Sequence, residues 1–173
     1  MLETASARKY MVTIRKSTLA DTKCIDEIYA DAKKFMHSNG NPDQWNDEYP
    51  NILDANSDVE KGIGYVMEED GKVFAVFAFI IGPDPTYAII EDGAWPNKEP
   101  YGTIHRIASD GSHSGVMKMC TEFCSTLIDN VRIDTHKDNR FMLNALNRLG
   151  FTRCGIIHLE TGDPRIAFQK SFE

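Results

Sequence analysis

The sequence has no apolar segment long enough to cross a membrane. Its longest apolar run, VFAVFAFII at residues 73–81, is less than half of the roughly 20 apolar residues that a membrane-spanning helix needs. The N-terminal stretch MLETASARKYMVTIRKS also lacks the apolar core of a secretory signal peptide. These two absences predict a cytoplasmic protein with no membrane partner.

The spacing of the cysteines lacks the pairs that hold zinc or carry redox chemistry. The four cysteines, Cys24, Cys120, Cys124 and Cys154, contain no CxxC pair, and three of them fall within apolar patterns. We therefore expect reduced, mostly buried thiols in place of disulfides, as is usual in the cytoplasm, and no metal site.

Basic residues are fewer than acidic residues in this sequence. The chain has 19 lysine and arginine residues against 26 aspartates and glutamates, which gives a formal net charge of -7 and a pI of about 5.2. An acidic surface repels a phosphate backbone, so no nucleic-acid partner is expected.

Length and patterning describe one folded domain. With 173 residues, 42% of them hydrophobic, the chain is long enough to bury a proper core. Residues 1–10 show no periodicity and are interpreted as an N-terminal extension, which leaves residues 11–173 as a single domain. No repeat, low-complexity tract or linker divides this span.

Strand-like and helix-like patterns follow one another along the domain. Alternating or β-branched segments predict strands at residues 11–15, 64–68, 72–81, 103–108, 131–135, 151–157 and 165–170. Apolar residues at helical spacing predict helices after the capping Ser17 and Thr18, at 52–61, from Val116 to Ile128 and from Met142 to Leu149. This order predicts one sheet-based domain of the α/β or α+β class.

The middle of the chain holds the most apolar strand and the longest connection. The strand at 72–81 is almost wholly apolar, which predicts cover on both faces, and the preceding Asp70 and Gly71 predict a tight hairpin turn. The connection at 82–102 is rich in Pro, Gly and acidic residues. Long connections in compact domains are often functional, so we expect this one to help form a site.

A strand, a small-residue loop and a helix follow one another in IHRIASDGSHSGVMKMCTEFC, residues 104–124. The first backbone N–H groups of a helix are unpaired and lie at the positive end of its dipole, so such a loop can hold a phosphate. Here the N–H groups belong to Ser112, His113, Ser114, Gly115 and Val116. The alternative is a capped loop without a ligand, since short glycine motifs occur widely.

A second segment, VRIDTHKDNRFMLNALNRLGFTRCG at residues 131–155, joins a strand, an exposed Asn, a helix and a Leu-Gly-Phe turn into the next strand. Together with the first segment, it resembles the GNAT superfamily of N-acetyltransferases, and the likeness covers residues 11–170. The residues in register with the family's second conserved block are Asn139, Met142, Leu146, Leu149, Gly150 and Phe151. The resemblance implies the GNAT-like acyl-CoA N-acyltransferase fold, a central mixed sheet of about six or seven strands flanked by about four helices.

The match is looser in the first segment. The family pattern Gln/Arg-x-x-Gly-x-Gly/Ala falls on Ser112, Gly115 and Met117, so only the central glycine is kept. Ser112 has no guanidinium group. Backbone N–H groups, the hydroxyls of Ser112 and Ser114 and the small Gly115 can still form a diphosphate cradle.

The resemblance implies acetyl-CoA as cosubstrate, bound in a V-shaped gap between two splayed parallel strands, here 103–109 and 131–135. The Ile107 amide would polarise the thioester carbonyl, an oxyanion-type role. The residues implied to bind acetyl-CoA are Ile107, Ala108, Ser109, Ser112, His113, Ser114, Gly115, Val116 and Asn139.

Direct attack of a primary amine on the thioester needs a general base with a pKa near neutrality. The candidates are His105, His136 and Asp134. His136 ends a strand where the gap opens, and its alternative role is a turn residue bound to Asp138. Strand alternation places His105 on the opposite face from Arg106, and its alternative role is a satisfied core histidine.

Asp134 has an alternative role, and the position of the family's usual general acid holds an apolar residue. The alternative role of Asp134 is an ion pair with Arg132 or Arg106. Many family members use a Tyr seven residues after the conserved Asn as the general acid, and this position holds Leu146.

The Trp45 loop and the connection at 82–102 are expected to form the acceptor site. An acidic and aromatic lining would suit a cationic amine. The residues expected to form that lining are Trp45, Tyr87, Glu91, Asp92 and Trp95. For the two tryptophans, the alternative is that they only anchor their loops on the body.

The function implied is an N-acetyltransferase, a single GNAT domain over residues 11–173, that transfers the acetyl group of acetyl-CoA to a primary amine of a small molecule or peptide. Ser112, Met117 and Leu146 also leave open a non-catalytic acyl-CoA-binding or sensing protein. An acyl-CoA enzyme with an oxygen or hydroxylamine acceptor is a third hypothesis, because fold alone does not decide function. Family members often pair through terminal strands, which would give a homodimer.

Overall fold

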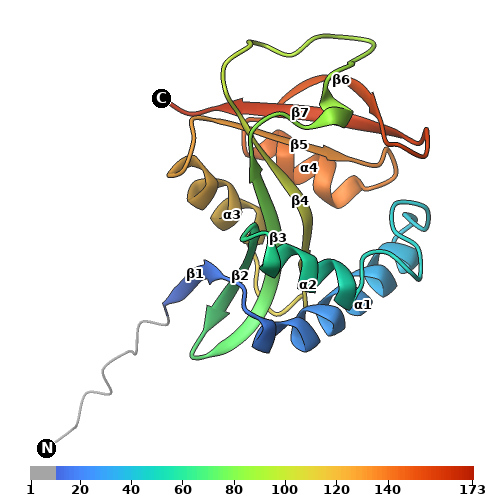
Figure 1. Cartoon of the computed structure of the whole chain (residues 1–173). Coiled ribbons are helices and arrows are strands. Elements are labelled where there is room, and N and C mark those ends of the chain that lie inside the picture. The colour runs from blue at the N-terminus through green and yellow to red at the C-terminus, as the bar shows by residue number, and fades with distance from the viewer. Residues whose placement is uncertain (1–10) are drawn as a thin grey trace, which may run out of the picture.

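In the computed structural model, which describes residues 11–173, a seven-stranded sheet runs in the order β1-β2-β3-β4-β5-β7-β6 (Figure 1). The strands are β1 Val12–Lys16, β2 Gly64–Glu69, β3 Lys72–Ile81, β4 Gly102–Ser109, β5 Asn130–Thr135, β6 Thr152–His158 and β7 Pro164–Ser171. Each expected strand is present, with both ends within one residue of the expected bounds. The expected N-terminal extension, residues 1–10, lies outside the described residues.

Among the described residues, four helices accompany the sheet, as the resemblance implied. They are α1 Thr22–Ser38, α2 Ile52–Glu60, α3 Val116–Ser125 and α4 Arg140–Arg148, and two short 3-10 helices occupy Leu19–Asp21 and Pro85–Tyr87. The third helix ends before the expected Ile128 because the N–H groups of Thr126 and Leu127 turn to carbonyls three residues back. Within the described part of the chain, none of the helices is long and apolar enough to span a membrane.

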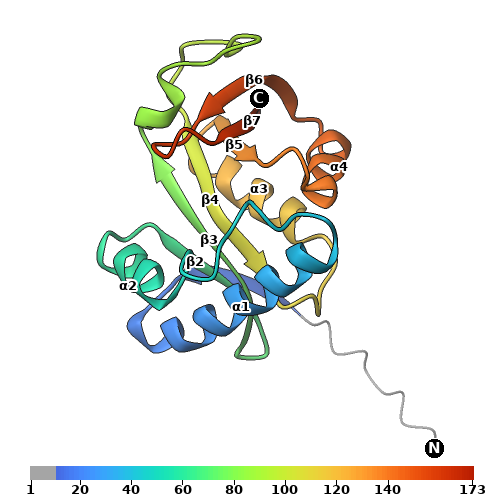
Figure 2. The same cartoon turned by 90° about the vertical axis from the view of Figure 1, so that its right-hand side faces the viewer.

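The sheet separates the two largest apolar cores. Helices α1 and α2 cover one face, and α3 and α4 cover the other (Figures 1 and 2). Strand β3 has six consecutive buried residues, with Val76 in the first core and Phe77 in the second, which confirms the expected cover on both faces. The four cysteines are free thiols, three of them buried, as expected.

The sheet parts between β4 and β5. These strands are parallel neighbours, yet only two residue pairs join them, Gly102 with Val131 and Thr103 with Arg132. Beyond these pairs the two strands separate (Figure 1). The gap implied by the resemblance is therefore present, and the edge of β4 that faces it is free of a strand partner after Thr103.

A bulge in β4 lies beside this gap. Ala78 pairs with His105 and Val76 pairs with Ala108, so Arg106 and Ile107 together face the single residue Phe77. Arg106 adopts a φ of 49°, in the left-handed region. A bulge leaves its extra residue unpaired and re-aims the neighbouring side chains. Simple alternation therefore fails here, and the expectation that His105 and Arg106 lie on opposite faces is wrong, because both line one cavity.

The connection at 82–102 packs against β6. Glu91 and Ile156 exchange two backbone hydrogen bonds, each of 2.8 Å. Two glycines permit this close approach, since a Cβ at Gly93 would collide with the carbonyl of Cys154, and one at Gly155 with the carbonyl of Glu91. The connection is thus fixed on the outer strand of the sheet.

Candidate active site

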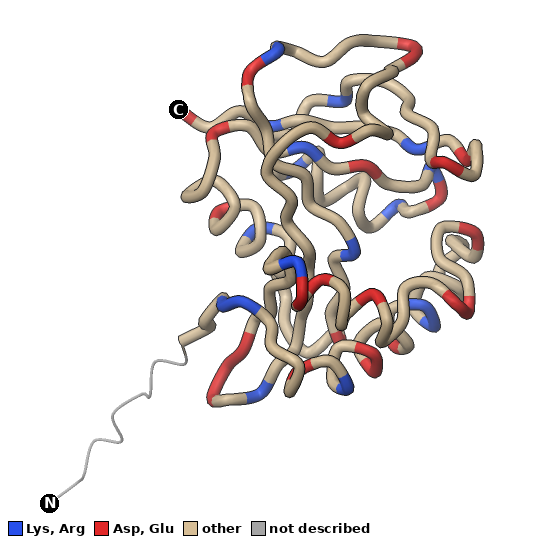
Figure 3. The backbone as a smooth tube through the Cα atoms, in the orientation of Figure 1, with Lys and Arg blue, Asp and Glu red and all other residues tan. Residues whose placement is uncertain are grey.

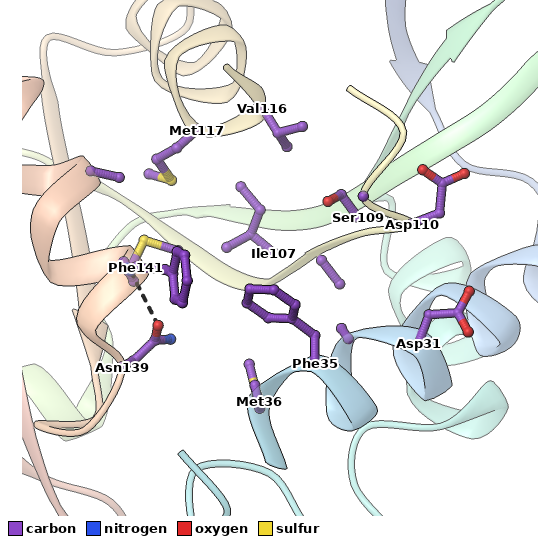
Figure 4. Close-up of a pocket in the computed structure, with 15 residues that line it drawn as sticks. Asp31, Phe35, Met36, Ile107, Ser109, Asp110, Val116, Met117, Asn139 and Phe141 are labelled. Carbon is purple, nitrogen blue, oxygen red and sulfur yellow. Dashed lines mark hydrogen bonds between the residues drawn. The ribbon is translucent and has the colours of Figure 1, made fainter. Parts of the chain in front are cut away.

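A first cavity of about 320 Å³ lies between β4, α1 and the N-termini of α3 and α4 (Figure 4). Five residues that the resemblance assigned to the cofactor are in its wall, namely Ile107, Ala108, Ser109, Val116 and Asn139. Helices α1 and α4 add residues that the resemblance did not assign to the cofactor, namely Asp31, Ala32, Phe35, Met36, Phe141, Met142 and Ala145.

Two phenylalanines join α1 to α4 across this cavity. The rings of Phe35 and Phe141 pack edge to face, with centroids 5.0 Å apart, and both side chains line the cavity (Figure 4). Each ring is about half exposed to solvent. The wall between them is mostly aliphatic, thioether or aromatic, which suits a flexible, weakly polar chain.

The expected phosphate loop is only partly open. The Ser112 N–H donates to the Asp110 carboxylate at 2.9 Å, so that group is already bonded within the loop. The His113 ring stacks on Phe74 with centroids 3.7 Å apart, and its Nε2 lies 2.8 Å from Glu69. Neither Ser112 nor His113 lines the cavity.

Within residues 11–173, the N-terminus of α3 retains donors without a hydrogen-bond partner. The Met119 N–H makes the first bond of this helix, to the Gly115 carbonyl at 3.0 Å, so the N–H groups of Val116, Met117 and Lys118 have no acceptor within the helix. Gly115 enters the helix in the left-handed conformation, with a φ of 73°. Val116 and Met117 are in the wall of the first cavity, which places these donors beside it.

Asn139 caps α4 and reaches across the gap. Its Oδ1 accepts the Met142 N–H at 3.1 Å, and its Nδ2 donates to Gln44 Oε1 at 2.9 Å. The same oxygen of Gln44 accepts from Asn41 at 3.0 Å and from Thr135 at 3.4 Å. Gln44 therefore ties the loop after α1 to the end of β5 and the start of α4.

A second cavity of about 590 Å³ adjoins the first, and the two share Met36, Ile107, Asn139 and Met142. Its acidic lining residues outnumber the basic ones, and they are Asp43, Asp84, Asp134, Glu160 and Asp163 against Arg106 and Arg165. Charges of both signs are interspersed over the fold as a whole (Figure 3), so this acid-rich wall is a local feature.

His105 lies in the wall of the second cavity and is held by a carboxylate. Its Nε2 is 2.9 Å from Asp84 Oδ2. Asp84 Oδ1 accepts the N–H of Thr86 at 2.9 Å and its hydroxyl at 2.8 Å. Burial opposes ionisation of Asp84, but the hydrogen bonds from His105 and Thr86 outweigh it and lower its pKa to about 2.

Asp134 also lines the second cavity, and its partner is neither Arg132 nor Arg106, so that expectation is wrong. Its Oδ2 accepts the Tyr87 hydroxyl at 2.7 Å. Burial raises the pKa of Asp134 despite that hydrogen bond. Arg132 is engaged elsewhere because it donates to Gln169 at 2.9 Å.

His136 lies outside the walls of both cavities. Its Nδ1 accepts the Asp138 N–H at 3.1 Å, the turn arrangement named as its alternative role. Arg106, by contrast, is bound by Asp58 of α2, with its Nε 3.1 Å from Oδ2, and its guanidinium lies 3.3 Å from the Tyr49 hydroxyl.

The structure separates the five residues expected to line the acceptor site. Only Trp45 is in the wall of the second cavity. Tyr87 is buried behind that wall, where it bonds Asp134, and the Trp95 indole donates to the Tyr87 carbonyl at 3.0 Å, so Trp95 anchors its loop. Glu91 and Asp92 are exposed on the connection beside β6.

Sequence reasoning missed Asp84, Gln44 and Tyr49, which all line the second cavity. An Asp before a Pro signals the N-cap of a helical turn, and Asp84 does cap Pro85–Tyr87. That signal says nothing of His105, which is 21 residues away in the chain.

Comparison with known proteins bears on this arrangement. No family model and no curated protein matches the chain. A GNAT-family acetyltransferase from Streptococcus agalactiae is 30% identical with a TM-score of 0.85, over 94% of this chain and 96% of that chain. A Salmonella typhimurium protein solved with its cofactor acetyl-CoA is 17% identical, with a TM-score of 0.60 over 94% of each chain. The PaiA N-acetyltransferase of Thermoplasma acidophilum, in complex with coenzyme A, is 10% identical with a TM-score of 0.62, over 94% and 99% of the chains.

A mixed sheet parted between two parallel strands defines an acyl-CoA N-acyltransferase fold, and the two more distant structures share that fold. The Streptococcus agalactiae structure shows the family as well as the fold, because its sequence is 30% identical and the match covers nearly the whole of both chains. The chain belongs to the GNAT family of acetyltransferases, which confirms the resemblance.

Proposed function

We propose that this protein is an acetyl-CoA-dependent N-acetyltransferase that acetylates a primary amine of a small molecule or peptide. The observation that carries the proposal is the meeting of two unlike cavities at Ile107. One is apolar with free helix donors beside it, and the other is acidic with a histidine in its wall. Such a pair suits an acyl thioester on one side and a cationic amine on the other.

The first cavity fits acetyl-CoA, which supplies the activated acetyl thioester when bound. The free edge of β4 from Ile107 to Ser109 offers backbone groups to the pantetheine arm, and Phe35 and Phe141 enclose it. The unpaired N–H groups at the start of α3 offer a diphosphate site. The complexes of the distant relatives with acetyl-CoA and coenzyme A support this assignment.

The second cavity fits the acceptor. Its acidic wall stabilises an ammonium group, and Trp45 contributes an aromatic face. Tyr87, Glu91, Asp92 and Trp95, which the sequence suggested for this role, lie outside this wall. The carboxylates of Glu160 and Asp163 take their place, so the proposed acceptor is still a cationic amine, bound by different residues.

Of the three candidate bases, His105 is best placed. It lies in the acceptor cavity two residues from Ile107, whereas His136 is outside it and Asp134 is held by Tyr87. His105 takes one proton from the acceptor ammonium and passes it to solvent. The amine nitrogen then attacks the thioester carbon, the C–N bond forms and the C–S bond breaks. The nitrogen releases its second proton, and the leaving sulfur gains one.

The position of the usual general acid offers no proton. Leu146 there is fully buried in the core, so water or another side chain must protonate the leaving sulfur, or it leaves as the thiolate. The same observation favours the second candidate function, a non-catalytic acyl-CoA-binding protein. Turnover separates the two, because a binding protein holds acetyl-CoA without releasing coenzyme A.

The test is a thiol-release assay with acetyl-CoA and a panel of amines that includes diamines, amino acids and short peptides. We expect turnover with cationic amines and a loss of about 10²- to 10⁴-fold in kcat/KM for His105→Ala, the range for loss of a general base. His136→Ala is the matched control and should retain activity. Tight acetyl-CoA binding without turnover on any amine would support the binding protein, and loss of activity only in His136→Ala would reject His105.

A further inference from the structure

We infer that Asp84 is a positioning residue that fixes the tautomer of His105, so that Nδ1 is the nitrogen that accepts the acceptor's proton. This inference rests on the proposed function. It adds a residue that lies outside both segments that carry the resemblance and comes from the long connection at 82–102.

The backbone and the carboxylate of Asp84 are both held by hydrogen bonds. Its Oδ1 accepts both donors of Thr86, and its own N–H donates to the Tyr101 hydroxyl at 2.9 Å. Oδ2 is left for His105, at 2.9 Å from Nε2. Asp84 is largely enclosed, with 13% of its side chain exposed, so water competes weakly for this contact.

An ionised carboxylate can only accept, so the proton of the neutral imidazole must lie on Nε2. The lone pair is then on Nδ1. Among residues 11–173, no group is hydrogen-bonded to Nδ1 of His105, and 23% of the side chain is exposed in the wall of the acceptor cavity. A proton from the acceptor ammonium can therefore pass to Nδ1, and the resulting imidazolium is stabilised by Asp84.

The charged and titratable groups around His105 come from three elements. Asp134 of β5 attracts its cationic form, and the Tyr87 ring lies 6.5 Å away from the side of the connection. Arg106 follows in β4, but its guanidinium is bound by Asp58. Of these groups, Asp84 alone is hydrogen-bonded to the imidazole within residues 11–173.

Replacement of Asp84 by Asn tests the tautomer directly. The cap of the Pro85–Tyr87 helix needs an acceptor toward Thr86, so the amide oxygen takes that place and the amide nitrogen faces His105. An amide N–H donates to Nε2 and moves the imidazole proton to Nδ1. The variant keeps the cap and the shape of the site but presents the wrong nitrogen to the acceptor.

The experiment compares wild-type protein with Asp84→Asn and with Glu99→Gln, which removes one exposed negative charge from the same connection. We expect Asp84→Asn to lose about 10²-fold or more in kcat, the scale of general-base catalysis, with an altered pH–rate profile and an unchanged Kd for acetyl-CoA. Glu99→Gln should match wild type in all three. Equal kcat and the same pH profile in Asp84→Asn would overturn the inference while leaving the proposed function intact.

A second experiment, NMR spectroscopy of the histidine side chains, needs no acceptor amine. In protein with ¹⁵N-labelled histidine, we expect the His105 signals of the wild type at neutral pH to show a proton on Nε2, and those of Asp84→Asn to show it on Nδ1. His105→Ala identifies the signals. A wild-type imidazole protonated on Nδ1, or no change in Asp84→Asn, would overturn the inference even if no amine were turned over.

Discussion

The carboxyl group of Asp134 accepts a hydrogen bond from the Tyr87 hydroxyl instead of pairing with a cation. Burial raises its pKa, and neither the bond from Tyr87 nor the attraction of His105 cancels that effect. An Asp in an unfolded chain ionises near pH 3.9. The folded protein keeps this proton to higher pH, so the contribution of Asp134 to stability is full below about pH 4 and is lost as the pH rises through the folded-state pKa.

Asp134→Asn should remove this pH dependence, because the amide oxygen still accepts from Tyr87 but no charge has to be buried. We expect the free energy of unfolding of the variant, relative to wild type, to increase from pH 4 to pH 8 in urea denaturation. Asp129→Asn, at an exposed position just before β5, is the control and should show a constant difference. A constant difference for Asp134→Asn as well would show that its carboxyl group titrates normally.

At the scale of the element, the connection at 82–102 shows that a local sequence pattern can indicate a functional segment without showing which of its residues reach the site. Its length indicated a functional segment, and it does supply Asp84 and Thr86 to the second cavity. Its aromatic and acidic middle, however, is attached to β6 by the bonds between Glu91 and Ile156. The attachment depends on two glycines, Gly93 and Gly155, which meet only after the sheet has formed.

Gly155→Ala should detach the connection from β6, because the added Cβ would overlap the backbone carbonyl of Glu91, which has little room to move. We expect a loss of roughly 1–3 kcal/mol in the free energy of unfolding, as for other overpacked sites. Hydrogen exchange should show loss of protection at the Ile156 amide. Gly162→Ala, whose Cβ meets no atom within 4 Å, should keep that protection. Unchanged exchange at Ile156 in Gly155→Ala would contradict the docking geometry.

At the scale of the whole molecule, the sheet is two pieces joined weakly at β4 and β5. Two residue pairs bridge these strands, against six between β5 and β7. Phe35 with Phe141 and Gln44 with Asn139 add contacts across the gap. A ligand held between β4, α3 and α4 would contact both pieces, so it should stabilise the whole fold.

Acetyl-CoA at 100 times its Kd should add about 2.7 kcal/mol of stability by mass action. For a domain of this size, that corresponds to a rise of roughly 5–10 °C in Tm, measured by calorimetry. Acetyl-pantetheine lacks the diphosphate, so at the same concentration it should raise the Tm less if the N–H groups of α3 bind the diphosphate. Equal Tm shifts with acetyl-CoA and acetyl-pantetheine would contradict diphosphate binding at the start of α3. No Tm shift with acetyl-CoA would contradict its binding in the first cavity.

The sequence by itself determined the elements and the family. The apolar run of β3, the helical spacing of α1 and α3 and the segment around Asn139 depend on neighbours close in the chain, so they could be recognised without coordinates. Strand ends were therefore predicted to within one residue.

Only the tertiary structure decided which side chains meet. The bulge at Arg106 cancelled the alternation that would have separated it from His105. Asp84 is hydrogen-bonded to His105, which is 21 residues away in the sequence, and Tyr87 is hydrogen-bonded to Asp134, which is 47 residues away. Such contacts depend on where a long connection crosses the sheet, which is set by packing on β6 and by close approach at two glycines. No local pattern of residues records that path.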